Sequence, residues 1–315
     1  KIGYIGAVWA SSNKLFLILS AVAAVLSHAI RAQRWKLLLN PLGYRFDLKN
    51  GFLSVMIGYF INLAIPRGGE VSRCYNLYRL NRIPVDVSLG TVVAERVIDL
   101  LFLITLIAVS FIIEIDNLVA FFNSEEVQSL TQQKEKRSYL LIVISALVFI
   151  AAMIILFRFM LEKKKNLVLR LLIKTKSALV GVKDGAKSIL RLEYKSLFIF
   201  YSFMIWVLYY FMMYTVMLAF PETQNLGMGA SLTIFVIGGI AMVVPLPGGA
   251  GSFHVLVSTG LIILYGLAQD KAIAFTFIFH AWQTLVIILV GALSLLASQL
   301  IKNKIERNQK QNIIS

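Results

Sequence analysis

The sequence is poor in the residues that build disulfide scaffolds, metal centres and soluble surfaces. One cysteine, Cys74, excludes an intrachain disulfide and a cysteine-rich metal site. The three histidines form no metal-ligand spacing and no Walker A motif is present, so neither a metal ion nor any other cofactor is predicted. Of the 315 residues, 15% are charged and 58% hydrophobic, whereas a soluble domain has about 25% charged residues. Disorder, a fibrous repeat and a soluble nucleic-acid-binding protein are therefore excluded, despite a net charge of +15.

The remaining composition is typical of a polytopic membrane protein, so we expect an all-α bundle of membrane helices. A spanning helix needs about 20 apolar residues. The expected membrane segments are residues 15–30, 51–65, 92–113, 139–157, 196–220, 230–246, 252–267 and 272–301. The segment 51–65 is short and is expected to be re-entrant or to leave the membrane on the side where it enters. The charge-free stretch that contains 230–246 and 252–267 is broken near Pro245. These two segments either both span the membrane or form a re-entrant pair.

Basic residues gather in three stretches, 31–49, 158–195 and 302–310, which the positive-inside rule places in the cytoplasm. Residues 114–138 carry five acids and three bases and are expected outside. Residues 163–192 mix apolar and basic residues at helical spacing, as in an amphipathic surface helix or an ordinary linker. The predicted organisation is one transmembrane domain, 1–301, and a basic cytoplasmic tail, 302–315. Because the first residue is Lys, a further helix upstream is left open.

The first candidate site is a break that follows the short apolar segment 51–65. The residues of the break are Pro66, Gly68 and Gly69, and its charged residues are Arg67, Glu70 and Arg73. Proline and glycine stop a helix and allow close backbone approach, and a broken helix at membrane depth has to line protein or a wet cavity. A guanidinium group suits a phosphate or carboxylate. We predict that the three charged residues bind substrate; the alternative is a loop that contacts lipid headgroups.

The second candidate site is the charged group Glu95, Arg96 and Asp99 at the start of an apolar run. Glu95 and Asp99 are four residues apart and share a helix face, and Arg96 and Asp99 are spaced to pair. Charged residues inside a membrane usually face the bundle and pair with one another. The group is interpreted as a coupling or gating cluster that also holds Arg67 or Glu70, or as a structural ion cluster that joins helices.

The third candidate site is the break near residue 245. Its helix-breaking residues are Pro245, Pro247, Gly248, Gly249 and Gly251. Ser252 is the expected N-cap of the next helix, whose free N–H groups favour an anion. His254 falls in the first turn and is predicted to contact substrate, although a lone histidine is more often a packing residue.

The first and third sites share a pattern of apolar half-helix, proline, two glycines and a new helix. Interrupted apolar segments in corresponding positions of two halves point to a transport site at the membrane midplane. The hypothesis is therefore an inverted repeat with two broken or re-entrant helix motifs that open from opposite sides.

Four motifs in order along nearly the whole chain carry a family resemblance. They are Arg34-Trp35-x-x-Leu38-Leu39, then Asn62 with Pro66-Arg67-Gly68-Gly69-Glu70-x-x-Arg73, then Val93-x-Glu95-Arg96-x-x-Asp99, and finally Pro247-Gly248-Gly249-x-Gly251. Together they resemble the lysylphosphatidylglycerol synthase transmembrane-region family, also called the flippase-like domain family.

The resemblance implies a multi-pass protein of the bacterial inner membrane with re-entrant helices, a cytoplasmic C-terminus and a role in moving lipids. In the full synthases this region is thought to flip an aminoacylated lipid that a separate soluble domain makes. The chain has no room for that domain after Ile301, so synthesis is not expected. The resemblance leads us to expect an acidic residue after the Pro-Gly-Gly-x-Gly motif, but this chain has His254 there. Together with Arg67 and Arg73, His254 favours a lipid with an anionic or phosphate-bearing headgroup.

Three functions remain as expectations. The first is a lipid flippase with a polar cavity between the two broken helices and membrane lipids as its partners. The second is a non-catalytic membrane protein that recruits another protein through its basic segment, and the third is a membrane enzyme that acts on a lipid-linked substrate. A homo-oligomer is left open.

Overall fold

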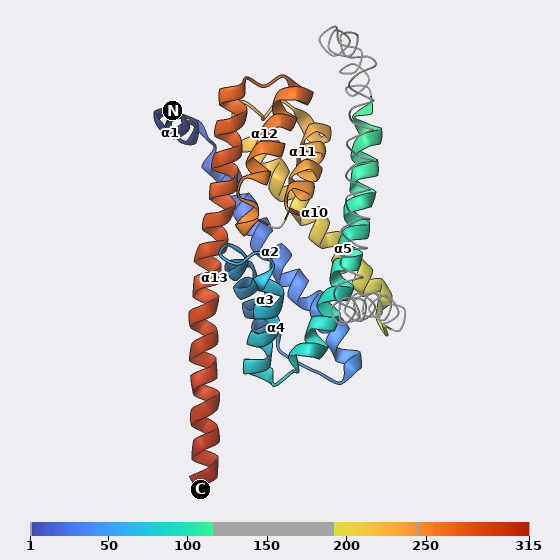
Figure 1. Cartoon of the computed structure of the whole chain (residues 1–315), viewed down its shortest axis with the longest axis vertical. Helices are drawn as coiled ribbons and strands as arrows, with labels where there is room; N and C mark the ends of the chain where they lie inside the picture. The colour runs from blue at the N-terminus through green and yellow to red at the C-terminus, as the bar shows by residue number, and fades with distance from the viewer. Residues whose placement is uncertain (1, 116–191, 245, 315) are drawn as a thin grey trace, which may run out of the picture. The chain divides into compact units, whose positions relative to one another are not determined.

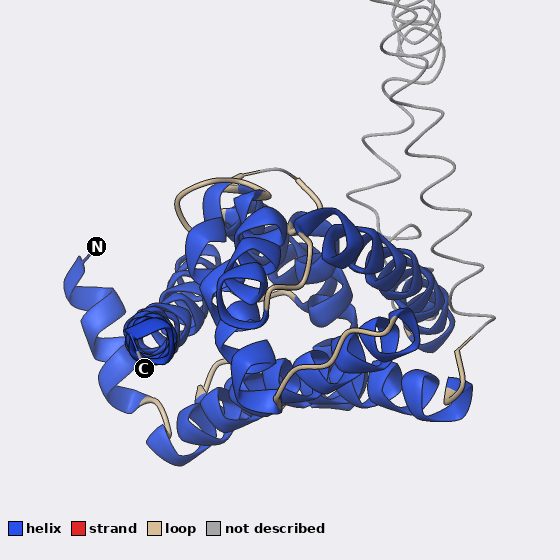
Figure 2. Ribbon diagram, turned by 90° about the horizontal axis from the view of Figure 1, so that it is seen from below, coloured by secondary structure: helices blue, strands red, loops and turns tan. Residues whose placement is uncertain are grey.

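The computed structural model describes residues 2–115, 192–244 and 246–314. These residues belong almost wholly to one compact unit, formed by residues 1–114 and 185–315. The expected span 139–157, the acidic loop, the basic segment 163–192 and Pro245 lie outside the described residues, wholly or in large part. Throughout the described residues the regular structure is helical, without a strand, which confirms the predicted all-α class (Figure 2).

The described helices, in chain order, are α1 (Ile2–Ser11), α2 (Lys14–Leu39), the short 3-10 helix η1 (Asn40–Leu42), α3 (Leu48–Asn62), α4 (Gly68–Asn81), α5 (Val85–Ile113), α10 (Lys195–Ala219), α11 (Gly227–Ala241), the 3-10 helix η2 (Pro247–Gly249), α12 (Ser252–Tyr265) and α13 (Gln269–Ile314). Within the described ranges, five stretches are long and apolar enough to cross a membrane. They are Lys14–Leu42, Val85–Ile113, Lys195–Ala219, Pro247–Tyr265 and Gln269–Gln309.

Helix α2 is longer than the sequence predicts. It was expected to stop at Arg31 and to be followed by a basic loop, but it continues through Arg31 and Arg34 as far as Leu39. Both arginines are buried, with 3% and 0% of their surface exposed, because carboxylates on α5 neutralise them. The prediction that these two residues lie in a cytoplasmic loop is therefore wrong. Helix α5 likewise begins seven residues before the expected position, at Val85.

Helices α3 and α4 form a hairpin around the first predicted break. With 15 and 14 residues they are about 22 and 21 Å long, shorter than the roughly 30 Å hydrocarbon core of a bilayer. Arg67 takes the left-handed conformation (φ 59°) at the turn, and Asn62 Oδ1 accepts a hydrogen bond of 2.7 Å from the Gly69 N–H. A Cβ atom on Gly58 or Gly69 would collide with the carbonyl oxygen of the other, so both glycines are needed for this close approach.

Helices α11 and α12 form a second hairpin around the other break. They have 15 and 14 residues, the same lengths as α3 and α4. Gly248, Gly249 and Gly251 all have positive φ in the connection. Helix α11 alone is shorter than the bilayer core, whereas the stretch Pro247–Tyr265, which contains α12, has the length and apolar character of a span.

The two hairpins belong to two halves with the same order of elements. In each half a long helix precedes a hairpin of two short helices, and a second long helix follows: α2, α3, α4, α5 and then α10, α11, α12, α13. Figure 1 shows that corresponding elements run in opposite directions: α2 descends and α10 rises, while α5 rises and α13 descends. One hairpin therefore enters the bundle from each end, as expected for an inverted repeat.

Each hairpin packs on its own apolar core. One core joins α2, α3, α4 and α5 around Trp35, Val55 and Leu77. The other joins α2, α10, α11, α12 and α13 around Phe253 and Phe275. The two hairpins thus pack on different apolar cores, and the buried charged residues collect where the first hairpin meets α2 and α5.

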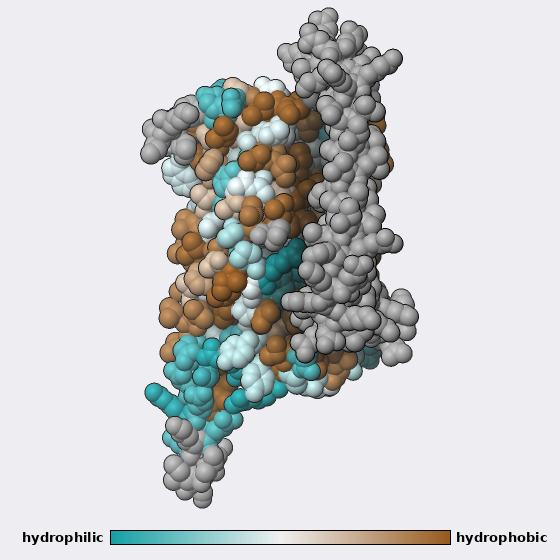
Figure 3. All heavy atoms as spheres, viewed as in Figure 1, coloured by the Kyte–Doolittle hydropathy of each residue, from teal (hydrophilic) through white to brown (hydrophobic). Residues whose placement is uncertain are grey.

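Helix α13 continues through the predicted tail without interruption as far as Ile314. The expected apolar run ended at Ile301, so the helix emerges from that run as a polar extension. Figure 3 shows the two regions on one face, with apolar residues over much of the bundle and hydrophilic residues at its lower end. Lys302, Lys304 and Arg307 lie on this extension.

Candidate functional site

Three helices bring five buried charged residues together. From α5, Asp99 accepts hydrogen bonds from Arg31 (2.9 Å) and Arg34 (2.7 Å) on α2. Glu95, one turn earlier on α5, accepts from Arg34 (3.3 Å) and from Arg73 on α4 (2.5 Å). Arg34 therefore bridges both carboxylates, and the spacings of three residues on α2 and four on α5 place each set on one helix face.

An outer ion pair closes this cluster. Arg96 on α5 donates to Glu70 on α4 at 3.0 Å and lies 3.7 Å from Asp99, so the expected Arg96–Asp99 pair forms. The side chains of Arg96 and Glu70 are 46% and 25% exposed, whereas the five inner side chains are at most 11% exposed. The Arg96–Glu70 pair is therefore the part of the cluster that solvent or a ligand meets first.

The cluster has one positive charge in excess. Its four positive charges are those of Arg31, Arg34, Arg73 and Arg96, and its three negative charges are those of Glu70, Glu95 and Asp99. Every carboxylate contacts a guanidinium group, which favours its ionised form. His28 on α2 is buried next to the cluster, and its ring lies 4.2 Å from that of Tyr59. We refer to the seven members as the arginine cluster.

Several polar atoms of the arginine cluster have no hydrogen-bond partner among the described residues. They are Arg31 Nε, Arg34 Nη2, Arg73 Nε and Glu70 Oε2. A buried donor without a partner costs free energy, and such groups are rare in folded proteins. The three unpaired arginine donors therefore indicate a place where an acceptor from a ligand or water binds.

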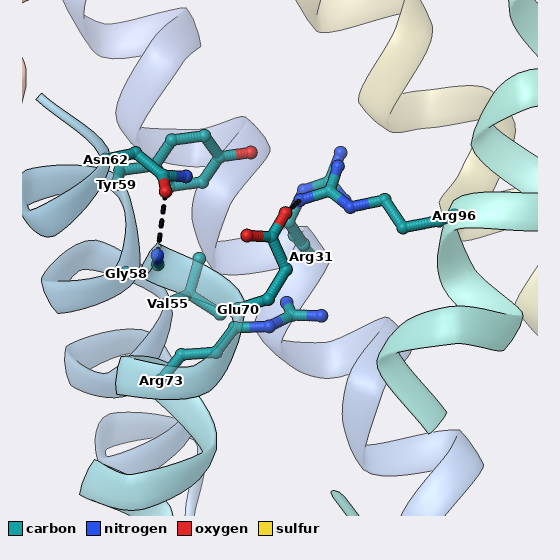
Figure 4. Close-up of a pocket in the computed structure, with 9 residues that line it drawn as sticks. Arg31, Val55, Gly58, Tyr59, Asn62, Glu70, Arg73 and Arg96 are labelled. Carbon is teal, nitrogen blue, oxygen red and sulfur yellow. Dashed lines mark hydrogen bonds and ion pairs between the residues drawn. The ribbon is translucent and has the colours of Figure 1, made fainter. Parts of the chain in front are cut away.

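A small cavity lies beside Arg31, Glu70 and Arg73 (Figure 4). It is lined by Arg31, Val55, Gly58, Tyr59, Asn62, Gly69, Glu70, Arg73 and Arg96. Its volume of about 10 Å³ for the centre of a water-sized sphere is enough for about one water molecule. Tyr59 and Arg31 each contact the hydroxyl of Tyr209 on α10, at 3.1 and 3.2 Å. In this state the cavity is thus closed to a lipid headgroup.

The tips of the two hairpins meet. Arg67 Nη2 donates to the Val243 carbonyl at 3.4 Å, and Leu63 lies against the α-carbon of Gly248. On the far side of this second tip, the Gly248 carbonyl lies 2.9 Å from His280 Nε2 on α13. The two predicted breaks are therefore neighbours in space, although almost 180 residues separate them.

The predicted residues fall into two groups. Glu70, Arg73, Glu95, Arg96 and Asp99 are brought together in the arginine cluster, so the expected association of Glu70 with the second candidate site is observed. Arg67 lies outside the cluster, at the hairpin tip.

The remaining predicted residues, Ser252 and His254, belong to the second hairpin. Gly251, not Ser252, is the N-cap of α12, and the Ser252 hydroxyl donates to the Ala241 carbonyl at 2.9 Å. The expected N-cap is therefore wrong, because Ser252 already belongs to the helix. His254 Nδ1 accepts from the Gly251 N–H at 3.3 Å, and its ring lies 4.6 Å from that of His280.

Sequence reasoning missed Arg31 and Arg34 as members of the site. Their charge suggested the end of a span, since an unpaired arginine is costly in a membrane. The available signal was their spacing: two arginines one turn apart can face two carboxylates one turn apart.

In the described part of the chain, five apolar stretches long enough to cross a membrane and a buried charged cluster between α2, α4 and α5 define a polytopic helical membrane protein. The chain belongs to the lysylphosphatidylglycerol synthase transmembrane-region family, whose family model matches residues 2–291. A UPF0104 membrane protein from Methanocaldococcus jannaschii is 40% identical over 92 residues, which make up 28% of this chain and 27% of that protein. The chain thus matches about a quarter of that relative's length. No solved structure matches the chain.

Proposed function

We propose that the protein is a lipid flippase that moves a phosphate-bearing headgroup across the membrane without changing it chemically. The observation that carries the proposal is the buried, net-positive arginine cluster beside two hairpin tips that enter from opposite ends. Membership of a family named for the membrane region of a lipid synthase agrees with a lipid-related role.

The paired hairpins provide a physical route for transport. In transporters with inverted repeats, discontinuous helices hold the substrate near the midplane and one repeat moves against the other. Here the headgroup enters when the α3–α4 hairpin moves away from α5 and the Arg96–Glu70 pair breaks. The second hairpin offers the exit towards the opposite side.

The proposed orientation follows from the basic residues. Lys36 lies in the last turn of α2, and Arg79 and Arg82 lie at the C-terminal end of α4. Arg79 donates to Gln299 on α13 at 2.6 Å, one turn before Lys302, so these basic residues gather at the end of the bundle where the first hairpin enters. By the positive-inside rule this end of the bundle faces the cytoplasm. The proposed location is the bacterial inner membrane, and the headgroup enters the arginine cluster from the cytoplasmic side.

Leaflet exchange in liposomes tests the proposal. The pure protein is reconstituted, and fluorescent lipids with anionic, zwitterionic and cationic headgroups are followed by their accessibility to a membrane-impermeant quencher. We expect exchange of phosphate-bearing lipids, lost in Arg96→Ala and Arg67→Ala, because the first variant removes the entry charge and the second removes the contact between the tips.

Arg307→Ala is the matched control, because Arg307 is exposed on the polar extension of α13. It should exchange lipids like the unaltered protein. Normal exchange in both test variants would overturn the assignment of the cavity. No exchange by a folded protein would overturn the flippase, and a chemically altered lipid on chromatography would replace it with an enzyme.

A further inference from the structure

We infer that His254 is a proton-binding site in the second hairpin. The neutral imidazole fastens the turn between α11 and α12, and uptake of a proton releases that turn. The inference goes beyond the proposed function, because it concerns how the hairpin is held and not what the protein moves.

The hydrogen bond at the start of α12 carries the first step. Gly251 is the N-cap of this helix, and its N–H donates to Nδ1 of His254, the third helical residue, at 3.3 Å. In a capping box the same position holds Glu or Gln, whose side chain accepts from the N-cap N–H. An imidazole nitrogen accepts through its lone pair, so this ring is neutral and carries its proton on Nε2. A proton on Nδ1 breaks the bond.

The neighbouring histidine carries the second step. The ring of His254 lies 4.6 Å from that of His280 on α13. The Gly248 carbonyl can only accept, so His280 Nε2 donates to it at 2.9 Å, and it does so in the neutral ring and in the imidazolium alike. Protonation of His280 therefore leaves its bond to the turn intact. Of the two bonds, the one made by His254 is sensitive to protons.

The groups around His254 supply no negative charge at close range. Helix α11 carries no charged residue, and α13 presents Phe277, whose ring lies 4.2 Å away. The nearest acid along α13 is Asp270, seven residues before Phe277 and so about 10 Å along the helix. At the tip of the first hairpin the charged residue is Arg67, which donates to the Val243 carbonyl. Because the closed turn needs the lone pair, the proton is taken up as the turn opens, and a falling pH favours the open turn.

The first hairpin has a corresponding bond that does not titrate. The Gly69 N–H, in the first turn of α4, donates to Asn62 Oδ1 at 2.7 Å. An amide side chain gains no proton between pH 5 and 8, whereas an imidazole ordinarily titrates at about pH 6.5. Gly251 is exposed and His254 is half-buried, so protons from solvent reach this bond. Acid therefore loosens the second turn and leaves the first one fastened.

Glycine amides report both turns in one NMR spectrum. The protein in phosphatidylcholine nanodiscs carries nitrogen-labelled glycine and carbonyl-labelled alanine, and the single Ala-Gly step of the sequence identifies the Gly251 amide. Gly69 is the internal control, identified by its shift in Asn62→Ala. Hydrogen exchange is measured from pH 8 to pH 5 and divided by the rate of an unprotected amide at the same pH. We expect the protection of Gly251 to fall about ten-fold, as for loss of one hydrogen bond, and that of Gly69 to stay constant.

Three substitutions test which group takes up the proton. His254→Gln places an accepting amide in the same capping position, so Gly251 should keep its protection at pH 5. His254→Glu should move the fall about two pH units lower, since a carboxylate titrates at about pH 4.3. His280→Gln is the matched control: it keeps a donor for the Gly248 carbonyl, so the fall should remain near neutral pH.

The unaltered protein alone can overturn the inference. Constant protection of Gly251 from pH 8 to pH 5 would do so, whichever variants fold, and an equal fall at Gly69 would show unfolding by acid instead. A fall that persists in His254→Gln and disappears in His280→Gln would assign the proton to His280. The measurement involves no transported lipid, so this inference and the flippase can fail independently.

Discussion

Replacing Glu95 by Gln is expected to destabilise the protein by about 3–5 kcal/mol, the cost of breaking a buried ion pair by removing one partner. Glu95 is 0% exposed and accepts hydrogen bonds from both Arg34 and Arg73. Glutamine has nearly the same shape, so packing is kept while the excess charge of the arginine cluster rises from one to two. For a chain of 315 residues this corresponds to a fall in melting temperature of about 5–10 °C.

Thermal unfolding in detergent, followed by tryptophan fluorescence, measures this effect. The control is Glu306→Gln, which makes the same change in the exposed Lys302–Glu306 pair of 3.3 Å and should cost about 0.3–0.5 kcal/mol. The double variant Glu95→Gln with Arg73→Gln should be less destabilised than the sum of its single variants, because it removes both charges of one pair. Equal melting temperatures for Glu95→Gln and Glu306→Gln would refute the reasoning.

Three further tests concern the first hairpin. Gly69→Ala should destabilise the protein by about 1–3 kcal/mol, because its Cβ atom would collide with Gly58. Its control is Gly90→Ala on α5, where a Cβ atom meets open space and the change should stabilise by about 0.5–1 kcal/mol. A higher melting temperature for Gly69→Ala than for Gly90→Ala would contradict this packing. Asn62→Ala removes the side chain that accepts from the Gly69 N–H and should cost about 0.5–2 kcal/mol in the same assay. Burial raises the pKa of the Cys74 thiol. At pH 7 maleimide should therefore label Cys74 far more slowly in the folded protein than in denaturant, and the labelling rate should rise at a higher pH than for a free thiol. Equal rates in the folded and denatured protein would show that Cys74 is exposed.

The fold class and the two hairpins were predictable because they depend on local signals. Apolar runs and the proline–glycine breaks mark where helices start and stop, and the structure places hairpin turns at both breaks. The end of α2 was not predictable in the same way. Arg31 and Arg34 look like the end of a span until α5 supplies Asp99 and Glu95, about 65 residues later in the chain.

The site was predictable in part for the same reason. The pairing of Arg96 with Asp99 follows from helical spacing within one segment, and it forms. Which carboxylate meets Arg73 depends on how the α3–α4 hairpin packs against α5, and that information is spread over the apolar core around Trp35 and Leu77. The excess charge of the cluster therefore became visible only when the helices were placed together.

The contacts of the α3–α4 hairpin also determine which side of it opens. Towards α13 the hairpin is fastened by hydrogen bonds without a carboxylate. Asn76 on α4 donates to Ser54 at 3.0 Å and accepts from Ser298 on α13 at 2.6 Å, and Arg79 on α4 donates to Gln299 on α13 at 2.6 Å. Towards α5 it is held by ion pairs, whose strength depends on the charges around them. A ligand anion competes with carboxylates for guanidinium groups and leaves amide–hydroxyl bonds unaffected. Under the proposed function we therefore expect entry of an anionic headgroup to weaken the contacts that face α5 and to leave those that face α13 intact.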